Sequence, residues 1–391
     1  MNVGARLSWH EDEGEAGPEN PPSLSDEQDD LPSLRAILYV DADRFYFSVE
    51  AIERPGLADD PRPIIISSDP RTSPRAVVTT ANDAARALGI NSAMSSAVAL
   101  RRAPDALFIP PRHDLYSQYS DRLMQLLRTA CPLVQQNSVD EAACQWDDNG
   151  YGAEPARALR ARVATELDLS ISLGLANCPL VAKMASETAK RSPDHLHIIK
   201  PGDEAAFLAP PPIRALIGVG PKAEARMVAL GIETIGALAE RTLGDLVDTF
   251  GANNGRYLYR ASRGLDDSTL SDARQTKSIS AEHTFAKDIV DRAVLWQQLR
   301  AQADEVSRRL RDDGLKTIEV AIKIRYADWE TLTRQMRLAS PTDDADRLAE
   351  SVAALMRRHW TRGRPVRMLG VRAGQLTAVG TVAQPQLPGL V

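Results

Sequence analysis

The sequence has no apolar run long enough to cross a membrane, and its N-terminus lacks the basic-then-apolar order of a secretion signal. Cysteine is also scarce. Cys131, Cys144 and Cys178 are odd in number and include no Cys-x-x-Cys pair. These absences argue against a transmembrane protein, a disulfide framework and a cysteine-based zinc site. They predict a soluble protein of the reducing cytoplasm.

An overall positive charge is lacking too, because the formal net charge is -6. Residues 1–35 hold nine acidic side chains against two arginines, so the rest of the chain carries about +1. Residues 277–372 hold 19 Lys and Arg against 14 Asp and Glu. The acidity therefore lies in the N-terminal tail, and the C-terminal region is locally basic, as a nucleic-acid partner would require.

Residues 1–35 contain Gly, Pro, Ser and acidic residues without a sustained apolar period. This composition predicts a disordered tail. The tail could compete with an acidic partner for the basic C-terminal region, or it could be an inert solvated extension, and we favour the second interpretation. The 391 residues as a whole are too many for one ordinary core, so several domains are expected.

A run of apolar residues from Ile37 to Val40 predicts a buried strand, which ends in Asp41, Ala42 and Asp43. Burial of a carboxylate is unfavourable unless a cation or an exposed edge compensates it. A second acidic pair, Asp140-Glu141, follows about a hundred residues later. Adjacent side chains of a strand point to opposite faces, so these two can share one site only at a turn or bulge. Two separated carboxylate sites are what a pair of cations on a triphosphate needs.

Three blocks together resemble the signature of Y-family, DNA polymerase IV-like translesion polymerases. They are Val40-Asp-Ala-Asp-Arg-Phe-Tyr-Phe-Ser-Val-Glu50, Thr80-Ala-Asn82 followed by Ala85-Arg86, and Ser138-Val-Asp-Glu-Ala142. The resemblance extends over residues 36–376. It implies an α+β multidomain fold shaped like a right hand, with a mixed α/β palm, small fingers, a helical thumb and a little finger. The implied ranges are palm 36–44 and 112–199, fingers 45–111, thumb 200–265, linker 266–276, little finger 277–376 and a flexible tail 377–391.

The resemblance also implies the residues of the site. The catalytic metal ligands would be Asp41, Asp140 and Glu141 with the carbonyl oxygen of Ala42, holding two Mg²⁺ ions; Asp43 would have a structural role. The nucleotide would be contacted by Thr80, Arg86 and Lys183, with Tyr46 as a steric gate against the 2′-hydroxyl of a ribonucleotide. Tyr46 could instead be plain core packing beside Phe45 and Phe47.

Asp83 departs from the family pattern, in which a tyrosine usually occupies this position. A carboxylate beside a triphosphate is repulsive unless it turns away or pairs with Arg86. We therefore expect Asp83 to weaken nucleotide binding. Two smaller departures, Ala143 in place of a tyrosine and Cys178 in place of a lysine, bear on catalytic vigour and leave the metal site unaffected.

Residues 217–222, Ile-Gly-Val-Gly-Pro-Lys, lie between two expected helices and resemble a helix-hairpin-helix turn. Gly218, Gly220 and Lys222 would bind a DNA phosphate through backbone N–H groups at a helix N-terminus, without reading sequence. The alternative is a plain glycine turn between packed helices.

Six elements are expected after the linker, in the order βαββαβ of a ferredoxin-like unit. They are strand 278–285, helix 291–312, strands 316–325 and 329–338, helix 343–359 and strand 366–375. Apolar residues alternate with polar ones along the second strand, so one sheet face is core and the other carries Lys323 and Arg325. That face could lie along DNA phosphates or could simply be solvated, and charge alone does not decide.

The C-terminal residues Gln386, Leu387 and Leu390 resemble a sliding-clamp-binding tail. The sequence therefore predicts a monomeric, magnesium-dependent DNA polymerase of the translesion type, with primer-template DNA, a dNTP and a sliding clamp as partners. The alternative is a catalytically weak or idle family member that acts as a DNA- and clamp-binding scaffold.

Overall fold

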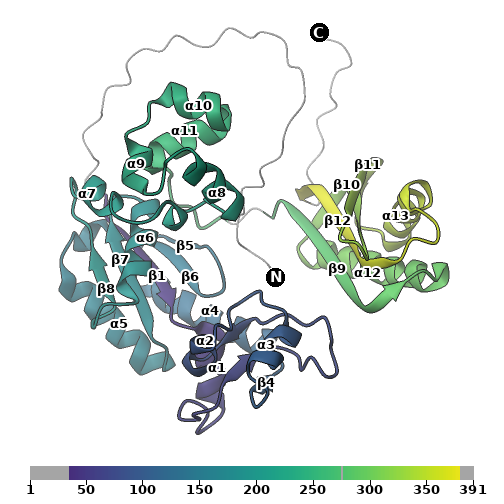
Figure 1. Ribbon diagram of the computed structural model, residues 1–391, viewed down its shortest axis with the longest axis horizontal. Helices are drawn as coiled ribbons and strands as arrows, with labels where there is room; N and C mark the ends of the chain where they lie inside the picture. The colour runs from purple at the N-terminus through teal and green to yellow at the C-terminus, as the bar shows by residue number, and fades with distance from the viewer. Residues whose placement is uncertain (1–34, 274–275, 379–391) are drawn as a thin grey trace. The chain divides into compact units, whose positions relative to one another are not determined.

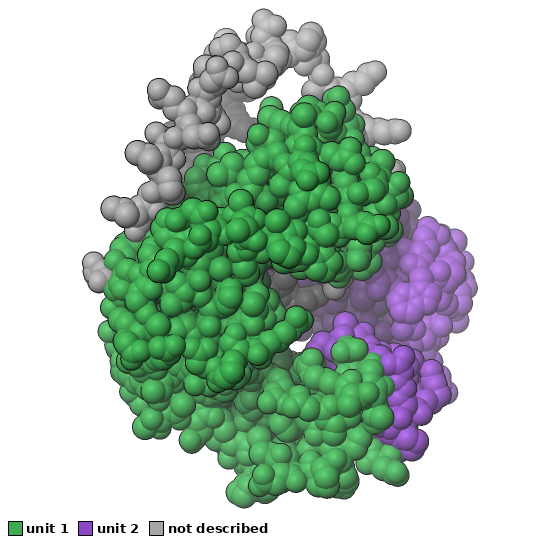
Figure 2. Space-filling view, turned by 60° about the vertical axis from the view of Figure 1, so that its left-hand side comes forward, with its two compact units in different colours: residues 1–66, 79–91, 105–273 green, residues 67–78, 92–104, 274–391 purple. Residues whose placement is uncertain are grey.

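The computed structural model describes residues 35–273 and 276–378, and Figure 1 shows their helices and strands. The described residues form two compact units (Figure 2). The first takes residues 35–66, 79–91 and 105–273, and the second takes residues 67–78, 92–104 and 276–378. In neither unit is a described helix long and apolar enough to cross a lipid bilayer.

The first unit contains a five-stranded sheet of order β5-β6-β1-β7-β8. Its strands are β5 (Val134–Gln136), β6 (Glu141–Gln145), β1 (Ile37–Ala42), β7 (Ile171–Ala176) and β8 (Leu196–Ile198). β1 is antiparallel to both of its neighbours, β6 and β7, and all six of its residues are buried. The apolar run Ile37–Val40 thus forms the middle strand of the sheet.

Alternate residues of β1 enter two different cores. Leu38 and Val40 pack on the side of α4 (His113–Ala130) and α5 (Ala153–Leu167). Ile37 and Tyr39 pack on the side of α6 (Pro179–Ala189). Because side chains alternate along a strand, Asp41 faces the same side as Ile37 and Tyr39. The end of β1 therefore presents a carboxylate toward α6.

Helix α6 lies very close to β7 at Gly174. A Cβ atom added to Gly174 would come within 2.0 Å of the Ala182 carbonyl oxygen and 2.3 Å of the Ser186 amide nitrogen. These contacts are with backbone, which cannot turn aside as a flexible side chain can. Only glycine therefore permits this packing of helix against strand.

Helix α1 (Phe45–Glu53) is anchored to α4 by Glu50, whose side chain is fully buried. Arg112 and Tyr116 donate hydrogen bonds to its carboxylate at 2.6 and 2.7 Å, and Arg54 lies 3.1 Å away. Burial raises the pKa of Glu50, but these donors outweigh it and the pKa is lowered. The buried carboxylate is thus compensated and holds α1 in place.

The strands of a small three-stranded sheet, of order β3-β2-β4, follow α1 in the sequence. It consists of β2 (Ile64–Ile66), β3 (Thr80–Ala81) and β4 (Leu107–Ile109). Three consecutive apolar residues, 76–78, predict a short strand from the sequence, and this prediction is wrong, since Val77 makes only an isolated bridge to Ser95. Asn82 explains the shift, because its side chain bonds to Arg62 and Ile64 and draws Thr80–Ala81 into pairing instead.

Short helices follow β8 in the chain, where the resemblance implies a helical thumb. They are α7 (Glu204–Leu208), α8 (Pro221–Ala229), α9 (Ile235–Ala239), α10 (Leu243–Phe250) and α11 (Ala252–Ala261). Their apolar residues share one core with α6.

The second unit contains the six elements expected after the linker. They are β9 (Ser278–Ile289), α12 (Arg292–Asp312), β10 (Leu315–Tyr326), β11 (Thr331–Thr342), α13 (Ala345–His359) and β12 (Val366–Ala378). The order βαββαβ is confirmed, and each βαβ crossover is split by a third strand, since the lateral order is β11-β10-β12-β9. Val320, Ile322 and Ile324 enter the core shared with the two helices.

Candidate active site

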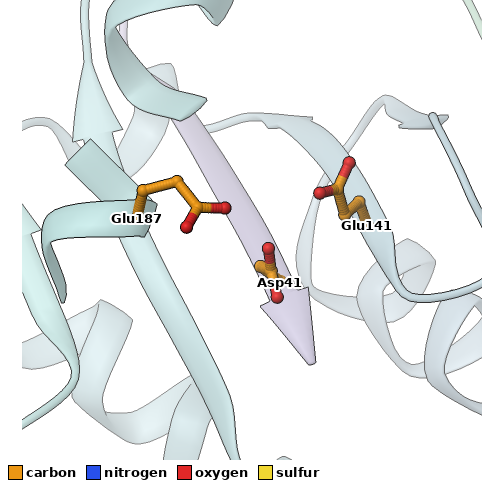
Figure 3. A group of neighbouring side chains, drawn as sticks. All are labelled: Asp41, Glu141 and Glu187. Carbon is orange, nitrogen blue, oxygen red and sulfur yellow. The ribbon is translucent and has the colours of Figure 1, made fainter. Parts of the chain in front are cut away.

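Asp41 and Glu141 lie opposite each other on β1 and β6. Directly opposed residues of an antiparallel pair project to the same side of the sheet. Glu187 reaches the same place from α6 (Figure 3). One carboxylate oxygen from each of the three lies within 4.8 Å of the others. The strand register thus brings together two of the predicted metal ligands.

Asp140 lies in the turn that precedes β6. Ser138 Oγ donates to its carboxylate at 2.5 Å and accepts from the Glu141 amide at 3.0 Å. The Asp140 carboxylate is outside the group of three described above. Burial raises its pKa, and the negative charge of Glu141 raises it further. This turn is the interruption of strand alternation that the sequence required.

Two lysines supply the opposing charge. Lys190 Nζ, at the C-cap of α6, lies 2.8 Å from Asp41 and 2.9 Å from Glu187, and Lys183 Nζ lies 2.7 Å from Glu141. Burial raises the pKa of Asp41 to about 7, although Lys190 acts to lower it. Burial also acts to raise the pKa of Glu141, but Lys183 outweighs it and the pKa is lowered.

Sequence reasoning missed Lys190 and Glu187. A signal was present, because Lys183 and Lys190 are seven residues apart. That spacing is about two helical turns, so both lysines lie on one face of α6.

Lys183, predicted to contact the nucleotide, is held between Glu141 and Tyr39. Its ammonium lies 3.1 Å from the Tyr39 hydroxyl and 5.2 Å from the ring centroid. The Tyr39 hydroxyl also donates to Glu141 at 2.9 Å, and burial raises the pKa of Tyr39. Lys183 and Tyr39 therefore fix the position of the Glu141 carboxylate.

Asp43 makes contacts that suit its expected structural role. Its carboxylate accepts from Ser170 Oγ at 2.6 Å and Ser172 Oγ at 2.7 Å, and His195 Nδ1 lies 3.0 Å away. Ser48 Oγ donates to the Asp43 carbonyl oxygen at 2.8 Å. These bonds join the end of β1 to β7 and to the start of α1.

Tyr46 is half-buried on the first turn of α1. Its ring packs edge-on against Tyr116, with centroids 4.7 Å apart. Burial raises the pKa of its hydroxyl, and the charge of Asp140 adds to the effect. The contacts of the ring are thus with Phe45 and Tyr116, and its role as a steric gate stays a prediction.

Thr80 and Arg86 lie together, since Arg86 donates to Thr80 Oγ1 at 3.2 Å and to the Ala81 carbonyl oxygen at 2.9 Å. Asp83 does not pair with Arg86. Its carboxylate forms an ion pair of 2.5 Å with Arg44, which has a left-handed backbone with φ 49°. Both partners of this pair are exposed.

The predicted DNA contacts lie away from the carboxylates along the chain. Gly218 has φ 88°, Gly220 is the N-cap of α8, and Pro221 occupies the first turn. No side chain caps this helix N-terminus, and Lys222 is exposed beside it. This geometry leaves backbone N–H groups available to a phosphate.

Lys323 and Arg325 lie on the polar face of β10. Lys323 is not free, because its ammonium lies 3.0 Å from Glu282. Arg325 donates to Thr331 Oγ1 at 2.9 Å. The predicted partner-binding residues Gln386, Leu387 and Leu390, and the acidic tail 1–34, lie outside the described residues.

Carboxylates on opposed strands of a sheet, a helical region with a glycine turn, and a basic βαββαβ unit are together the arrangement expected of a nucleic-acid polymerase. Comparison with known proteins gives the family. Residues 40–187 match the impB/mucB/samB family, residues 276–387 match its C-terminal domain, and residues 214–266 match the DNA polymerase-iota thumb domain.

Curated relatives agree over nearly the whole length. DNA polymerase IV of Alkalilimnicola ehrlichii is 36% identical over 89% of this chain and 97% of its own. DNA polymerase IV of Streptomyces coelicolor is 39% identical over 86% of this chain and 70% of its own. The chain therefore belongs to the impB/mucB/samB family, the Y-family of translesion DNA polymerases.

Solved structures show the same fold. A chimaera of the Y-family DNA polymerases Dbh and Dpo4 superposes with a TM-score of 0.78 at 22% identity, over 88% of this chain and 99% of its own. DinB from Sulfolobus solfataricus superposes with a TM-score of 0.58 at 22% identity, over 87% and 98%. The DNA polymerase IV relatives and the family models, rather than these superpositions, identify the chain as a DNA-directed DNA polymerase of the translesion type.

Proposed function

We propose that Asp41, Asp140, Glu141 and the Ala42 carbonyl oxygen hold two Mg²⁺ ions at which a deoxynucleotide is joined to a primer 3′-end. The observation that carries this proposal is the opposed pair Asp41 and Glu141, each facing a lysine ammonium.

The donor set fits a hard divalent cation. All three side chains offer carboxylate oxygens, which Mg²⁺ prefers. Asp41 is only 5% exposed, and burial holds its pKa at about 7. A buried carboxylate of this kind needs a positive charge, and Lys190 supplies one at 2.8 Å. Cations bound here would satisfy the same need.

Bound Mg²⁺ would activate the primer hydroxyl and neutralise the charge that develops on the phosphates. The side chains of the protein do the positioning. Lys183 and Tyr39 orient Glu141, the ligand that we place nearest the 3′-hydroxyl. Lys190, once cations occupy the carboxylates, can turn its ammonium to a phosphate oxygen.

The nucleotide would meet Arg86 and Thr80 on one side. Arg86 offers a fork of donors that matches a phosphate group. The Tyr46 ring would lie under the sugar and exclude a 2′-hydroxyl. The glycine turn Gly218–Gly220 with Lys222 would bind a backbone phosphate of the primer-template, and Lys323 and Arg325 would lie along the duplex.

Primer extension tests the proposal. The chain should extend a primer with Mg²⁺ and stop when EDTA is added in excess, and DNA binding measured by anisotropy should persist in both conditions. Extension that continues in EDTA would contradict the metal assignment. A catalytically idle scaffold is not favoured, because Asp41, Asp140 and Glu141 are all present; DNA binding without any extension would restore it.

The clamp and the monomeric state are tested separately. Deletion of residues 384–391 should abolish binding to a sliding clamp while extension on short templates is unchanged. Light scattering of the full chain should give the mass of a monomer. Equal clamp binding by the truncated and full chains would remove Gln386, Leu387 and Leu390 from the proposal.

A further inference from the structure

Trp329, in the turn between β10 and β11, is the most exposed of the large hydrophobic side chains in the described residues, at 62%. The turn is tight, since Tyr326 N–H donates to the Glu330 carbonyl oxygen at 2.9 Å and Trp329 N–H donates to the Tyr326 carbonyl oxygen at 3.1 Å. Trp329 has φ 71°, in the left-handed region that disfavours a bulky residue. The fold thus holds a large aromatic ring in water at a strained position.

Arg367 lies against this ring, with its guanidinium 4.2 Å from the ring centroid. Its position comes from an irregularity in β12. The pairing of β12 with β9 and with β10 includes Val366 and Met368 and skips Arg367 in both ladders. A bulge of this kind re-aims the extra side chain. Arg325 lies near the same ring, at 5.7 Å from its centroid.

The charges around Trp329 are unevenly matched. Arg364 binds both acidic neighbours in the turn, Asp328 at 2.5 Å and Glu330 at 2.6 Å. Within the described ranges Arg367 makes no ion pair. Burial lowers its pKa and repulsion from Arg75 and Arg325 lowers it further, while Asp288 acts in the opposite direction without pairing with it. An arginine that lies against an indole and forms no ion pair offers its donors to an anion from outside.

We propose that Trp329, Arg367 and Arg325 form a binding site for unpaired template DNA, in which a base stacks on the indole and an adjacent phosphate meets the guanidinium groups. Stacking on an exposed ring suits any base, because every base has a π-face, and arginine suits phosphate. A protein partner is less well matched, because interface hot spots lie in desolvated pockets and this ring stands clear of one. The inference rests on the proposed function only in taking primer-template DNA as the substrate.

The test compares three DNA probes bound to the full chain, measured by fluorescence anisotropy. One primer-template has a one-nucleotide 5′ template overhang, one has a twelve-nucleotide oligo-dT overhang, and one has twelve abasic sites instead. Wild-type protein should bind the dT overhang more tightly than either of the others. Trp329→Ala should weaken binding to the dT overhang by about 5- to 150-fold and leave the one-nucleotide probe unchanged.

Two variants separate stacking from charge. Trp329→Phe should keep most of the gain from the overhang, because it retains a ring. Arg367→Ala should weaken binding to the dT and abasic overhangs alike. Arg311→Ala, an exposed arginine on α12, is the matched control and should change nothing.

Equal binding of the dT overhang by wild type and Trp329→Ala would overturn the proposal. An equal loss of binding to all three probes in Trp329→Ala would also overturn it, because such a loss indicates a folding defect or a general contact with DNA. Primer extension on the one-nucleotide probe is scored in parallel with wild type. An absence of extension would strike the proposed function and leave the overhang measurement readable.

Discussion

Both units of the molecule hold a cation over an aromatic ring, but the two cations have opposite surroundings. Lys183 lies 5.2 Å from the Tyr39 ring and bonds to Glu141, in a site where Tyr39 is almost fully buried. Arg367 lies 4.2 Å from the exposed Trp329 ring and faces other arginines. Under the two proposals above, the first arrangement would exchange an ammonium for a metal ion, whereas the second would accept a phosphate. The same kind of contact, a cationic side chain over an aromatic ring, is thus proposed to serve a metal ion in one unit and an anion in the other.

The largest expected effect lies in the carboxylates of the first unit. Glu141→Ala or Asp140→Ala should lower primer extension by about 10³-fold, since metal-assisted charge stabilisation is worth several kcal/mol. DNA affinity should stay nearly constant. Glu240→Ala removes an exposed carboxylate from the same unit and serves as the control. Extension retained by either active-site variant would end the comparison, because the first unit would then need no cation.

Tyr46 in the first unit and Trp329 in the second can be compared by their effect on the choice between deoxynucleotides and ribonucleotides. Tyr46→Ala should raise ribonucleotide incorporation by about tenfold or more, because room for a 2′-hydroxyl would open beneath the sugar. Tyr46→Phe keeps the ring and should keep the preference for deoxynucleotides. Trp329→Ala should not alter sugar selection. Steady-state incorporation of a dNTP against its matching NTP measures the effect, and an unchanged ratio in Tyr46→Ala would reduce this ring to packing.

Lys190 in the first unit and Arg367 in the second can be compared by thermal unfolding with and without Mg²⁺. Lys190→Met should lower the stability of the metal-free protein by about 1–2 kcal/mol, because a buried carboxylate loses its charged donor. Mg²⁺ should restore much of that loss, since it would supply the missing charge. Arg367→Met serves as the counterpart and should show no dependence on Mg²⁺, because Arg367 forms no ion pair among the described residues and lies outside the carboxylate site. If Mg²⁺ failed to stabilise the Lys190→Met protein, the proposal that Mg²⁺ binds at Asp41 would be contradicted.

The smallest effect is expected from the ion pair between Arg44 and Asp83. Arg44 is paired with an acid, as Lys183 is, but it is exposed to solvent. Exposed pairs contribute about 0–1 kcal/mol. Asp83→Asn should free Arg44 for the triphosphate and lower the nucleotide KM by about two- to fivefold, with kcat unchanged. The double variant with Arg44→Gln should lose this gain. A KM that stays constant in Asp83→Asn would mean that this carboxylate does not oppose the nucleotide.

The sequence predicted the elements whose periodicity is long and regular. The six elements of the second unit agree with the structure because alternation on β10 and the 3.6-residue period on α12 extend over many residues. Residues 76–78 were mispredicted because three apolar residues do not fix a strand. The hydrogen bonds of the Asn82 side chain to Arg62 and Ile64, some twenty residues earlier in the chain, decided the pairing.

The carboxylates of the site could be predicted and their partners could not. Asp41 stands out because a buried strand ends in it, whereas Lys190 and Glu187 look like ordinary residues on a helix face. Their role depends on how closely α6 lies to β7, which is a matter of tertiary packing. Trp329 was missed for the same reason: neither the bulge at Arg367 nor the left-handed turn has a local sequence signature.

The close contact of α6 with β7 at Gly174 has a consequence for mutations that inactivate this enzyme. Lys183 and Glu187 lie on α6 and Lys190 is its C-cap residue, so a methyl group at position 174 would displace all three together. Random mutagenesis scored for lost DNA synthesis should therefore recover substitutions of Gly174 as well as of the acids, although the atoms nearest Gly174 are backbone atoms of α6.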